Sequence, residues 1–371
     1  MCYLCFFNIS AFFLKNWCSL SKLSNIALIG ANRCGGILVK KLKEAHIGFM
    51  YPINPWRSLG WRRWLLRDEL VFRDKVVLGI KNIVSWAPKL GLMKKPRYHK
   101  DGVTFLVAVK DEEMWIKPCI QSIQDVADEI IVVDSSVEDN TTKIVETLAS
   151  SNPKIKHIKF YWGGANAFAL SLHIGLSSAN YKWLFKWDSD LVAKSPQAIQ
   201  EWINRLKYLD PNRYYVIDIP RINLEGDLEH QSRTLPFGAY EGRLFTWSPE
   251  LRWGLKDNYY EQVSGDSIWG HRFPPWFNNL RWHEPYVFHC NIKSPKRALT
   301  RRYWGDYMVH KETRFADLDA YAAYRVRQDL GLSMEEAIKE TAKLIEKDMM
   351  PYDRARFGEL PELLKSSSVI P

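Results

Sequence analysis

The chain has 371 residues, of which 46% are hydrophobic and 25% are charged, a composition typical of a folded protein and unlike that of a disordered one. This length is sufficient for one large domain or two ordinary ones. The formal net charge of +10 excludes a generally acidic protein and favours an anionic partner, such as a phosphate-bearing ligand, an acidic glycan or an anionic membrane surface.

The first 14 residues are apolar, but they are fewer than the roughly 20 needed to span a bilayer, and no basic segment precedes them. We therefore expect no signal peptide here, and either an additional helix or strand or a contact with a membrane surface. The six cysteines form no regular framework, which favours reduced thiols in a cytosolic protein. The predicted location is cytoplasmic, with a peripheral membrane contact as the alternative.

Residues 25–54 have the pattern of one β-α-β unit, and Gly30, Gly35 and Gly36 are similar to the start of a Rossmann nucleotide site. Their spacing is not GxGxxG and no acidic residue follows the second strand, so a complete dinucleotide site is not expected. Residues 56–98 are basic and rich in tryptophan, and much of this stretch is predicted to be helical. It either contacts phospholipid headgroups or forms a solvated face and a linker.

From residue 102 onward, strands and helices alternate regularly. Strands are predicted at 103–109, 129–134, 155–161 and 182–188, with a helix between each pair. This order predicts an α/β fold with a parallel sheet, in which ligands bind beyond the carboxyl ends of the strands. Asp134 and Asp188 both stand at such ends, and we expect them to converge.

The run KWLFKWDSDLV brings an apolar strand up to two carboxylates, Asp188 and Asp190. In an extended chain they would share a face around Ser189, where like charges repel unless a cation or a shared proton compensates. A helix-capping role is not needed, because Ser195 and Pro196 already supply the cap and first position of the next helix. The pair therefore predicts a site for Mg²⁺ or Mn²⁺, completed by substrate phosphates.

These motifs together resemble the family-2-type glycosyltransferases with the GT-A fold, over residues 102–195. Those proteins have a strand ending in an Asn-Glu-Glu-like stretch, here VAVKDEE, then a segment similar to EIIVVDSSVEDNT, then an apolar strand ending in DxD. The resemblance implies a GT-A domain over 101–310, with a mostly parallel sheet flanked by helices. An N-terminal extension (1–100) would precede it and a helical tail (311–371) would follow, with Ser333 and Glu336 at capping-box spacing.

Carried over residue by residue, the resemblance implies that Asp134 lies against the nucleotide. It also implies that Asp188 and Asp190 hold a divalent metal and the sugar nucleotide, with the late His289 as a further metal ligand; otherwise His289 is a structural histidine. The remaining implied donor contacts are Val107, Val109, Lys110, Asp111, Glu113, Ser135 and Ser189. Ser135 replaces a frequent second aspartate, so the resemblance does not specify uridine, and His173 stands near a usual asparagine.

The activity implied is metal-dependent, inverting transfer of a sugar from a nucleotide-diphosphate donor to a glycan or lipid-linked acceptor. The metal would neutralise the leaving diphosphate, and a carboxylate would act as general base. Glu261, which we favour, and Asp266 are the candidates for this base; the alternative is that each is a solvated surface charge. A basic cluster either grips the diphosphate or forms a charged surface: Lys293, Lys296, Arg297, Arg301 and Arg302.

Two other functions stay open at this point. A sugar-nucleotide nucleotidyltransferase would share the fold, but it usually has a glycine-rich loop after the first strand, and VAVKDEEMW contains no glycine. A non-enzymatic protein that binds an anionic ligand or a membrane would explain the charge and the 16 tryptophans, but not the paired carboxylates. No nucleic-acid-binding motif occurs, so we expect no nucleic-acid partner.

Overall fold

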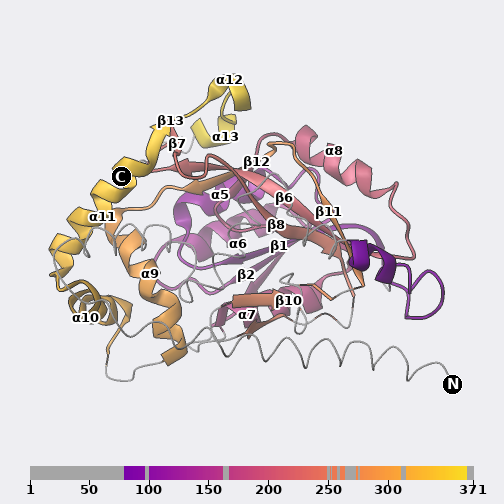
Figure 1. Cartoon of the computed structure of the whole chain (residues 1–371), viewed down its shortest axis with the longest axis horizontal. Coiled ribbons are helices and arrows are strands. Elements are labelled where there is room, and N and C mark those ends of the chain that lie inside the picture. Colours follow the sequence, from indigo (N-terminus) through magenta and orange to yellow (C-terminus); the bar gives the residue numbers. More distant parts are fainter. Residues whose placement is uncertain are drawn as a thin grey trace. The chain divides into compact units, whose positions relative to one another are not determined.

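The computed structural model describes residues 79–96, 100–161, 167–248, 251, 253–256, 260–263, 273–274, 276–310 and 315–365 (Figure 1). The β-α-β unit predicted at 25–54, most of the basic stretch at 56–98, and Asp266 lie outside these ranges. Within them, no helix is both long enough and apolar enough to cross a lipid bilayer.

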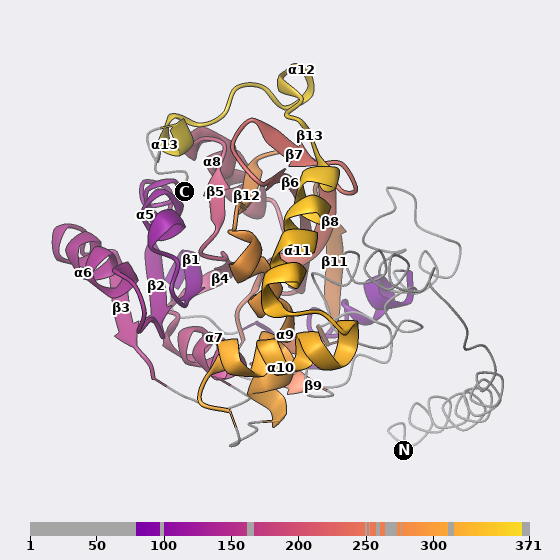
Figure 2. The ribbon, with the colours of Figure 1, turned by 90° about the vertical axis from the view of Figure 1, so that its left-hand side faces the viewer.

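The central sheet begins with four parallel strands in the order β4-β1-β2-β3 (Figure 2). Their bounds are β1 Lys100–Val109, β2 Glu129–Asp134, β3 Ile155–Lys159 and β4 Tyr181–Lys186. The helices between them are α5 Glu113–Gln121, α6 Thr141–Ser151 and α7 Ala167–Ser178. The regular alternation in the sequence therefore produces the predicted parallel sheet, and the carboxyl ends of its strands share one edge.

Helices cover both faces of these strands, which explains why the strands are apolar throughout. Phe105 and Val107 of β1 face a core shared with α5, α6 and α8 (Pro196–Leu206), whereas Leu106 faces α7. Helix α8 has the predicted start, with Ser195 accepting a hydrogen bond from the backbone of Ala198 at 3.1 Å and Pro196 following it. The sheet is thus fixed from both sides.

The second half of the sheet is mixed. Strand β8 (Phe237–Thr246) is antiparallel to both β4 and β6 (Tyr214–Glu225), and β11 (Phe277–Arg281) and β12 (Val287–Asn291) run parallel to β6. Short strands complete it: β5 Leu191–Ala193, β7 His230–Ser232 and β13 Met349–Pro351. A separate two-stranded sheet is formed by β9 Trp253–Lys256 and β10 Tyr260–Val263.

The pairing of β8 with β4 and β6 extends this second half of the sheet beyond the carboxyl end of β4. Phe185, one residue before the end of β4, pairs with Leu244, so the first part of β8 extends beyond β4. Leu244 also pairs with Ile217, and β6 continues from there to its end at residue 225, where β12 lies beside it. Side chains from β6, β8 and β12 can therefore meet those that follow β1, β2 and β4.

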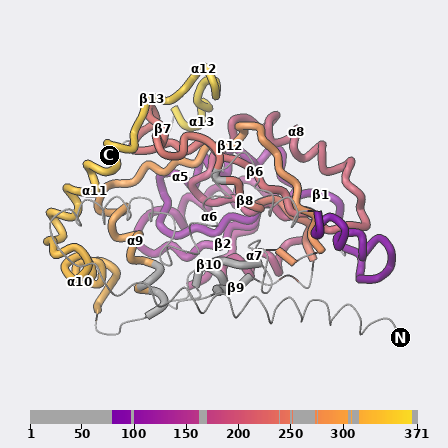
Figure 3. Tube along the Cα trace, in the orientation of Figure 1, coloured from indigo at the N-terminus to yellow at the C-terminus, as the bar shows by residue number. Residues whose placement is uncertain are grey.

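The C-terminal helices α9 (Pro295–His310), α10 (Leu318–Leu330) and α11 (Met334–Asp348) pack against one another around a small apolar core. Helix α11 has the predicted capping box, with Ser333 and Glu336 exchanging hydrogen bonds. From α11 the chain continues into β13, which pairs with β7, and then into α12 (Arg354–Phe357) and α13 (Glu362–Lys365) (Figure 3).

Candidate functional site

The chain turns directly after β4, and the two carboxylates of the DSD sequence lie on this turn. The backbone N–H of Leu191 donates to the carbonyl of Asp188 at 2.9 Å, and the indole of Trp187 donates to the carbonyl of Leu191 at 3.0 Å. Our expectation of an extended chain with both carboxylates on one face is therefore wrong. Because residues 188–191 form a turn, Asp188 and Asp190 have different partners, and Ser189 between them is buried.

Asp188 lies between two cations. Its Oδ1 is 3.0 Å from Lys186 Nζ, and its Oδ2 is 2.7 Å from the guanidinium of Arg243, which also contacts Glu241 at 2.6 Å. Burial would raise the pKa of Asp188, but the charges of Arg243 and Lys186 outweigh it and hold this pKa well below its usual value. Asp188 is therefore ionised, and its charge is already balanced by protein side chains.

Asp190 is almost fully buried and faces β12. Its Oδ2 lies 3.5 Å from His289 Nε2 and 3.3 Å from Lys293 Nζ, and its carbonyl accepts a hydrogen bond from the backbone of Cys290 at 2.8 Å. Burial acts to raise the pKa of Asp190, but the charge that His289 carries when protonated and the charge of Lys293 outweigh it and hold this pKa well below the usual value. The structure thus brings Asp190 and His289, 99 positions apart in the sequence, into direct proximity.

The orientation of the His289 ring is fixed by Asn223. The amide nitrogen of Asn223 donates to the carbonyl of Leu235 at 2.8 Å, which leaves its Oδ1 to face His289 Nδ1 at 3.0 Å. An amide oxygen only accepts, so Nδ1 carries the proton and Nε2 of the neutral ring presents a lone pair. Burial lowers the pKa of His289 and favours this neutral form. A lone pair and a carboxylate oxygen therefore face each other, an arrangement that a cation between them stabilises.

The loops after β1 and β2 are joined by side-chain hydrogen bonds. Asp111, whose φ of 51° lies in the left-handed region that Asp tolerates, accepts hydrogen bonds from the backbone of Val137 and Glu138 at 2.9 Å each. Glu113 accepts from the backbone and the amide of Asn140 at 3.0 and 2.9 Å. These two predicted donor contacts thus fix the shape of the loops.

Other predicted donor contacts also have partners within the protein. The side chains of Val107 and Val109 are buried in the core, and the carbonyl of Val109 accepts hydrogen bonds from the backbone and the hydroxyl of Ser135. Asp134 is buried at the end of β2, and its carboxylate accepts from the backbone of Ser136 at 2.9 Å. Thr142 at 2.7 Å and His157 at 3.1 Å also contact this carboxylate. Lys110 is exposed.

Residues 104–263, which include these loops and the turn after β4, match the family model of glycosyl transferase family 2. This segment is a family 2 glycosyltransferase domain. The mixed α/β sheet with helices on both faces is the GT-A arrangement that the resemblance implied, so the predicted family and fold are confirmed.

Known proteins with some likeness include a TPR repeat-containing protein of Synechococcus elongatus, 22% identical over 187 residues. The match covers 50% of this chain and 41% of that protein, so the chain spans less than half of its relative's length. Two solved structures are similar at low identity. Staphylococcus aureus TarS residues 1–349 in complex with UDP has 13% identity and a TM-score of 0.35, covering 66% of this chain and 81% of that one. The mannosyltransferase PcManGT of Pyrobaculum calidifontis, in complex with GDP-Man and Mn²⁺, has 18% identity and a TM-score of 0.36, covering 79% and 88%.

The structure brings two of the three predicted metal ligands together, Asp190 of the family 2 segment and His289, which follows that segment on β12. Asp188 is directed to Lys186 and Arg243 instead. Among the described residues, no group of three His, Cys, Asp or Glu side chains could hold a metal by itself. Asp190 and His289 offer one oxygen and one nitrogen donor, so a divalent ion bound here would need its remaining ligands from substrate phosphate and water.

Three residues of the site were not predicted. Glu112 is buried in the loop after β1, where its Oε1 lies 2.9 Å from Arg297 and 3.2 Å from Arg301 of α9. Glu225 ends β6 and accepts a hydrogen bond from the amide of Asn291 at 2.8 Å; burial raises its pKa to about 7. Arg243, described above, is the third. Glu225 could have been predicted, because it is an acidic residue at the end of a strand, the same feature that indicated Asp134 and Asp188.

The predicted catalytic acids stay predictions. Glu261 lies on β10 opposite Leu255 of β9, and this hairpin contacts α7, so it is on the α7 side of the domain. Asp266 lies outside the described residues. Of the predicted basic cluster, Arg297 also donates to the carbonyl of Asp111, which connects α9 directly to the loop after β1.

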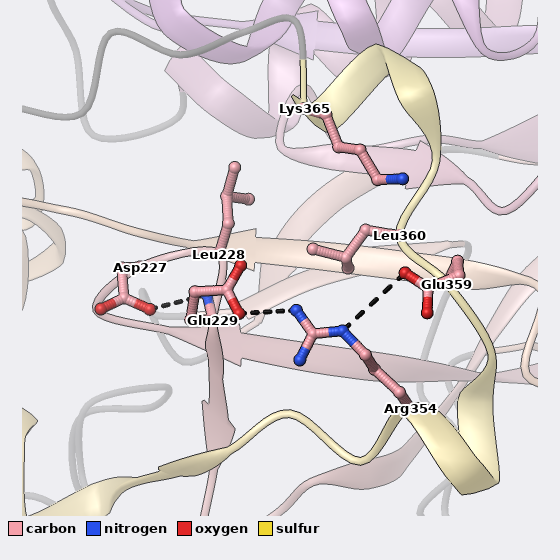
Figure 4. Close-up of a pocket in the computed structure, with 7 residues that line it drawn as sticks. All are labelled: Asp227, Leu228, Glu229, Arg354, Glu359, Leu360 and Lys365. Atoms are coloured by element: carbon pink, nitrogen blue, oxygen red, sulfur yellow. Dashed lines mark hydrogen bonds and ion pairs between the residues drawn. The ribbon is translucent and has the colours of Figure 1, made fainter.

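A cavity of about 430 Å³ lies between the β6–β7 turn and the segment carrying α12 and α13 (Figure 4). Its arginine, Arg354, is held by Glu229 at 2.6 Å and Glu359 at 3.8 Å. The full lining is Asp227, Leu228, Glu229, Arg354, Glu359, Leu360 and Lys365. None of these residues belongs to the carboxyl edge described above, and the acidic lining does not suit a diphosphate.

Proposed function

We propose that this chain is a metal-dependent glycosyltransferase that moves a sugar from a nucleotide-diphosphate donor to a hydroxyl group of an acceptor. The observation that carries the proposal is the meeting of Asp190 Oδ2 and His289 Nε2, 3.5 Å apart, at the carboxyl edge of the glycosyltransferase domain. Both atoms are electron-pair donors, and the fixed ring of His289 directs Nε2 at the carboxylate.

In this proposal Asp190 and His289 hold a Mn²⁺ or Mg²⁺ ion together with donor oxygens. When bound, the ion would neutralise the negative charge that develops on the leaving diphosphate. Asp188, held by Lys186 and Arg243, would fix the turn on which Asp190 lies. Its side chain is 28% exposed, and this exposed part would contact the donor.

Cations of the β12–α9 segment would contact the phosphates. Lys293 already lies 3.3 Å from Asp190, and Arg297 and Arg301 both reach the buried carboxylate of Glu112. Glu112 thus positions two guanidinium groups, whose planar donors suit phosphate oxygens, beside the metal site.

The reaction we infer is a displacement at the anomeric carbon with inversion. The acceptor oxygen forms the new C–O bond, the bond from the anomeric carbon to the diphosphate breaks, and the diphosphate takes the electron pair. The hydroxyl proton passes to a carboxylate, for which Glu261 and Asp266 remain our candidates. The proposed acceptor is a glycan or a lipid-linked saccharide, and the proposed location is cytoplasmic.

Calorimetric titration tests this proposal. UDP, GDP, CDP and dTDP would be titrated with and without Mn²⁺ into the wild type, Asp190→Asn and the control Asp101→Asn, whose side chain is 83% exposed and distant from the edge. We expect one diphosphate to bind with Mn²⁺, the control to behave as wild type, and Asp190→Asn to lose the metal-dependent part. If the folded wild type binds none of the four, or if Asp190→Asn binds as well as wild type, the proposal is wrong.

A further inference from the structure

Residues 79–96 expose an unusual amount of apolar surface. In the described part of the chain, ten large apolar side chains are exposed, and six of them lie in this one segment. They are Ile80, Ile83, Trp86, Leu90, Leu92 and Met93. Ile83, Leu90 and Leu92 are each more than 65% exposed, far beyond the partial exposure expected of a packed side chain.

The buried positions of the same segment are partly polar, although Pro88 is buried as well and Val84 and Ala87 are half-buried. Lys81 and Ser85 are buried, and Lys81 Nζ has no hydrogen-bond partner among the described residues. Asn82 accepts a hydrogen bond from Arg213 at 2.8 Å, and the guanidinium of Arg213 lies 4.5 Å from the ring of Trp86. An element on the surface of a domain normally turns its large apolar side chains toward the core, whereas here only Val84, Ala87 and Pro88 lie inward and the larger ones are exposed. The outward apolar side therefore serves something other than the core of this domain.

The segment is also held in place. Lys89 contacts Asp210 at 2.6 Å, and the hydroxyl of Tyr214 donates to the carbonyl of Lys94 at 3.3 Å. Its apolar side chains are thus presented from a fixed backbone.

The charge of the segment indicates what covers it. Residues 79–96 contain four lysines and no aspartate or glutamate, and Lys94 and Lys95 are exposed directly beside Leu92 and Met93. Aliphatic side chains, a tryptophan and adjacent lysines suit the interface of an anionic bilayer. There the apolar groups enter the acyl boundary and the lysines contact the phosphates. We propose that residues 79–95 form a docking surface for an anionic lipid membrane.

This surface shares no residue with the carboxyl edge, so docking and donor binding are separable. The proposal goes beyond glycosyl transfer because it states where the domain works and favours an acceptor that lies at the membrane surface.

Sedimentation of the full chain with vesicles tests the docking surface. Vesicles of phosphatidylcholine alone would be compared with vesicles that also contain phosphatidylglycerol, at low and high salt. We expect binding to the anionic vesicles that weakens with salt. Leu90→Gln/Leu92→Gln should reduce the affinity about tenfold or more, because two leucines no longer enter the bilayer. Lys94→Gln/Lys95→Gln should weaken binding to the anionic vesicles alone.

Tyr324→Ser, which removes an exposed aromatic side chain on α10, is the matched control and should bind as wild type. The diphosphate titration should be unchanged in all three variants, which shows that the fold is intact. The proposal is overturned if wild type does not bind anionic vesicles, or if both double variants bind as well as wild type. It is also overturned if light scattering shows a dimer that the leucine variant abolishes, because the surface would then bind a second copy.

Discussion

Replacing Asn223 by alanine is the sharpest test of the proposed metal site. The amide fixes the proton of His289 on Nδ1 by accepting at 3.0 Å, and it is itself fixed by donating to Leu235 at 2.8 Å. Without it, the imidazole can rotate or place its proton on Nε2, the atom that faces Asp190. We therefore expect weaker metal binding although no metal ligand has been changed.

The size of the effect follows from the contact of Asn223 with His289, a proposed metal ligand. Removing the partner of a ligating histidine typically lowers metal affinity 10–100-fold, or about 1.4–2.7 kcal/mol. The carbonyl of Leu235, a half-buried residue, also loses its donor, which should cost about 0.5–1.5 kcal/mol of folding stability. Both quantities are measurable: Mn²⁺ affinity by calorimetry at saturating nucleoside diphosphate, and stability by urea unfolding.

Asn223→Asp separates the two effects. Its carboxylate still accepts from His289 Nδ1 but no longer donates to Leu235, so it should lose stability and keep most of the metal affinity. Equal Mn²⁺ affinity in wild type and Asn223→Ala, with both proteins folded, would refute the reasoning. The same conclusion would follow if both variants lost affinity to the same extent.

Three further predictions concern the sheet and its edge. Gly175→Ala should destabilise the fold by about 1–3 kcal/mol in urea unfolding, because the added Cβ would lie 2.0 Å from Leu106 Cδ1. Arg243→Met should cost about 3 kcal/mol by the same measurement, since Asp188 loses its closest counter-charge. Burial raises the pKa of Glu225 from 4.5 to about 7, so its contribution to stability is complete below pH 4.5 and is lost as the pH rises toward 7. The loss amounts to about 3 kcal/mol, and Glu225→Gln should abolish it.

Each of these predictions has a clear contrary result. Wild-type stability of Gly175→Ala would mean that α7 can move away from β1, and a neutral Arg243→Met would mean that Lys186 alone balances Asp188. For the glutamate, unfolding would be compared at about pH 5 and about pH 8, with Glu229→Gln as the exposed control. A pH dependence that is the same in Glu225→Gln and wild type would contradict the assignment.

The parallel half of the sheet was predictable because its signals are local. Each strand is a short apolar run bounded by polar residues, and the carboxyl ends of parallel strands share an edge whatever the details of packing. That Asp134 and Asp188 follow strands ending at one edge therefore came from the order of elements alone, although β1 lies between those strands. The helix caps Ser195 and Ser333 were also predictable, since a helix cap depends on only a few neighbouring residues.

The partners at the edge were not predictable. His289 reaches Asp190 because β12 pairs with both β5 and β6, a register set by contacts between segments up to 100 residues apart. The turn after β4 could not be distinguished from an extended chain by side-chain spacing. The burial of Glu112 depends on α9, which lies almost 190 positions later.

The hydrogen bonds between the loops after β1 and β2 have a consequence for engineering. The carboxylates of residues 111 and 113 in the first loop fit the backbone of residues 137, 138 and 140 in the second. A graft of one loop from another transferase would leave these carboxylates, or the N–H groups they bind, without partners. In the proposed donor site, the two loops should therefore be transplanted together, and natural divergence at either loop should be accompanied by matching change at the other.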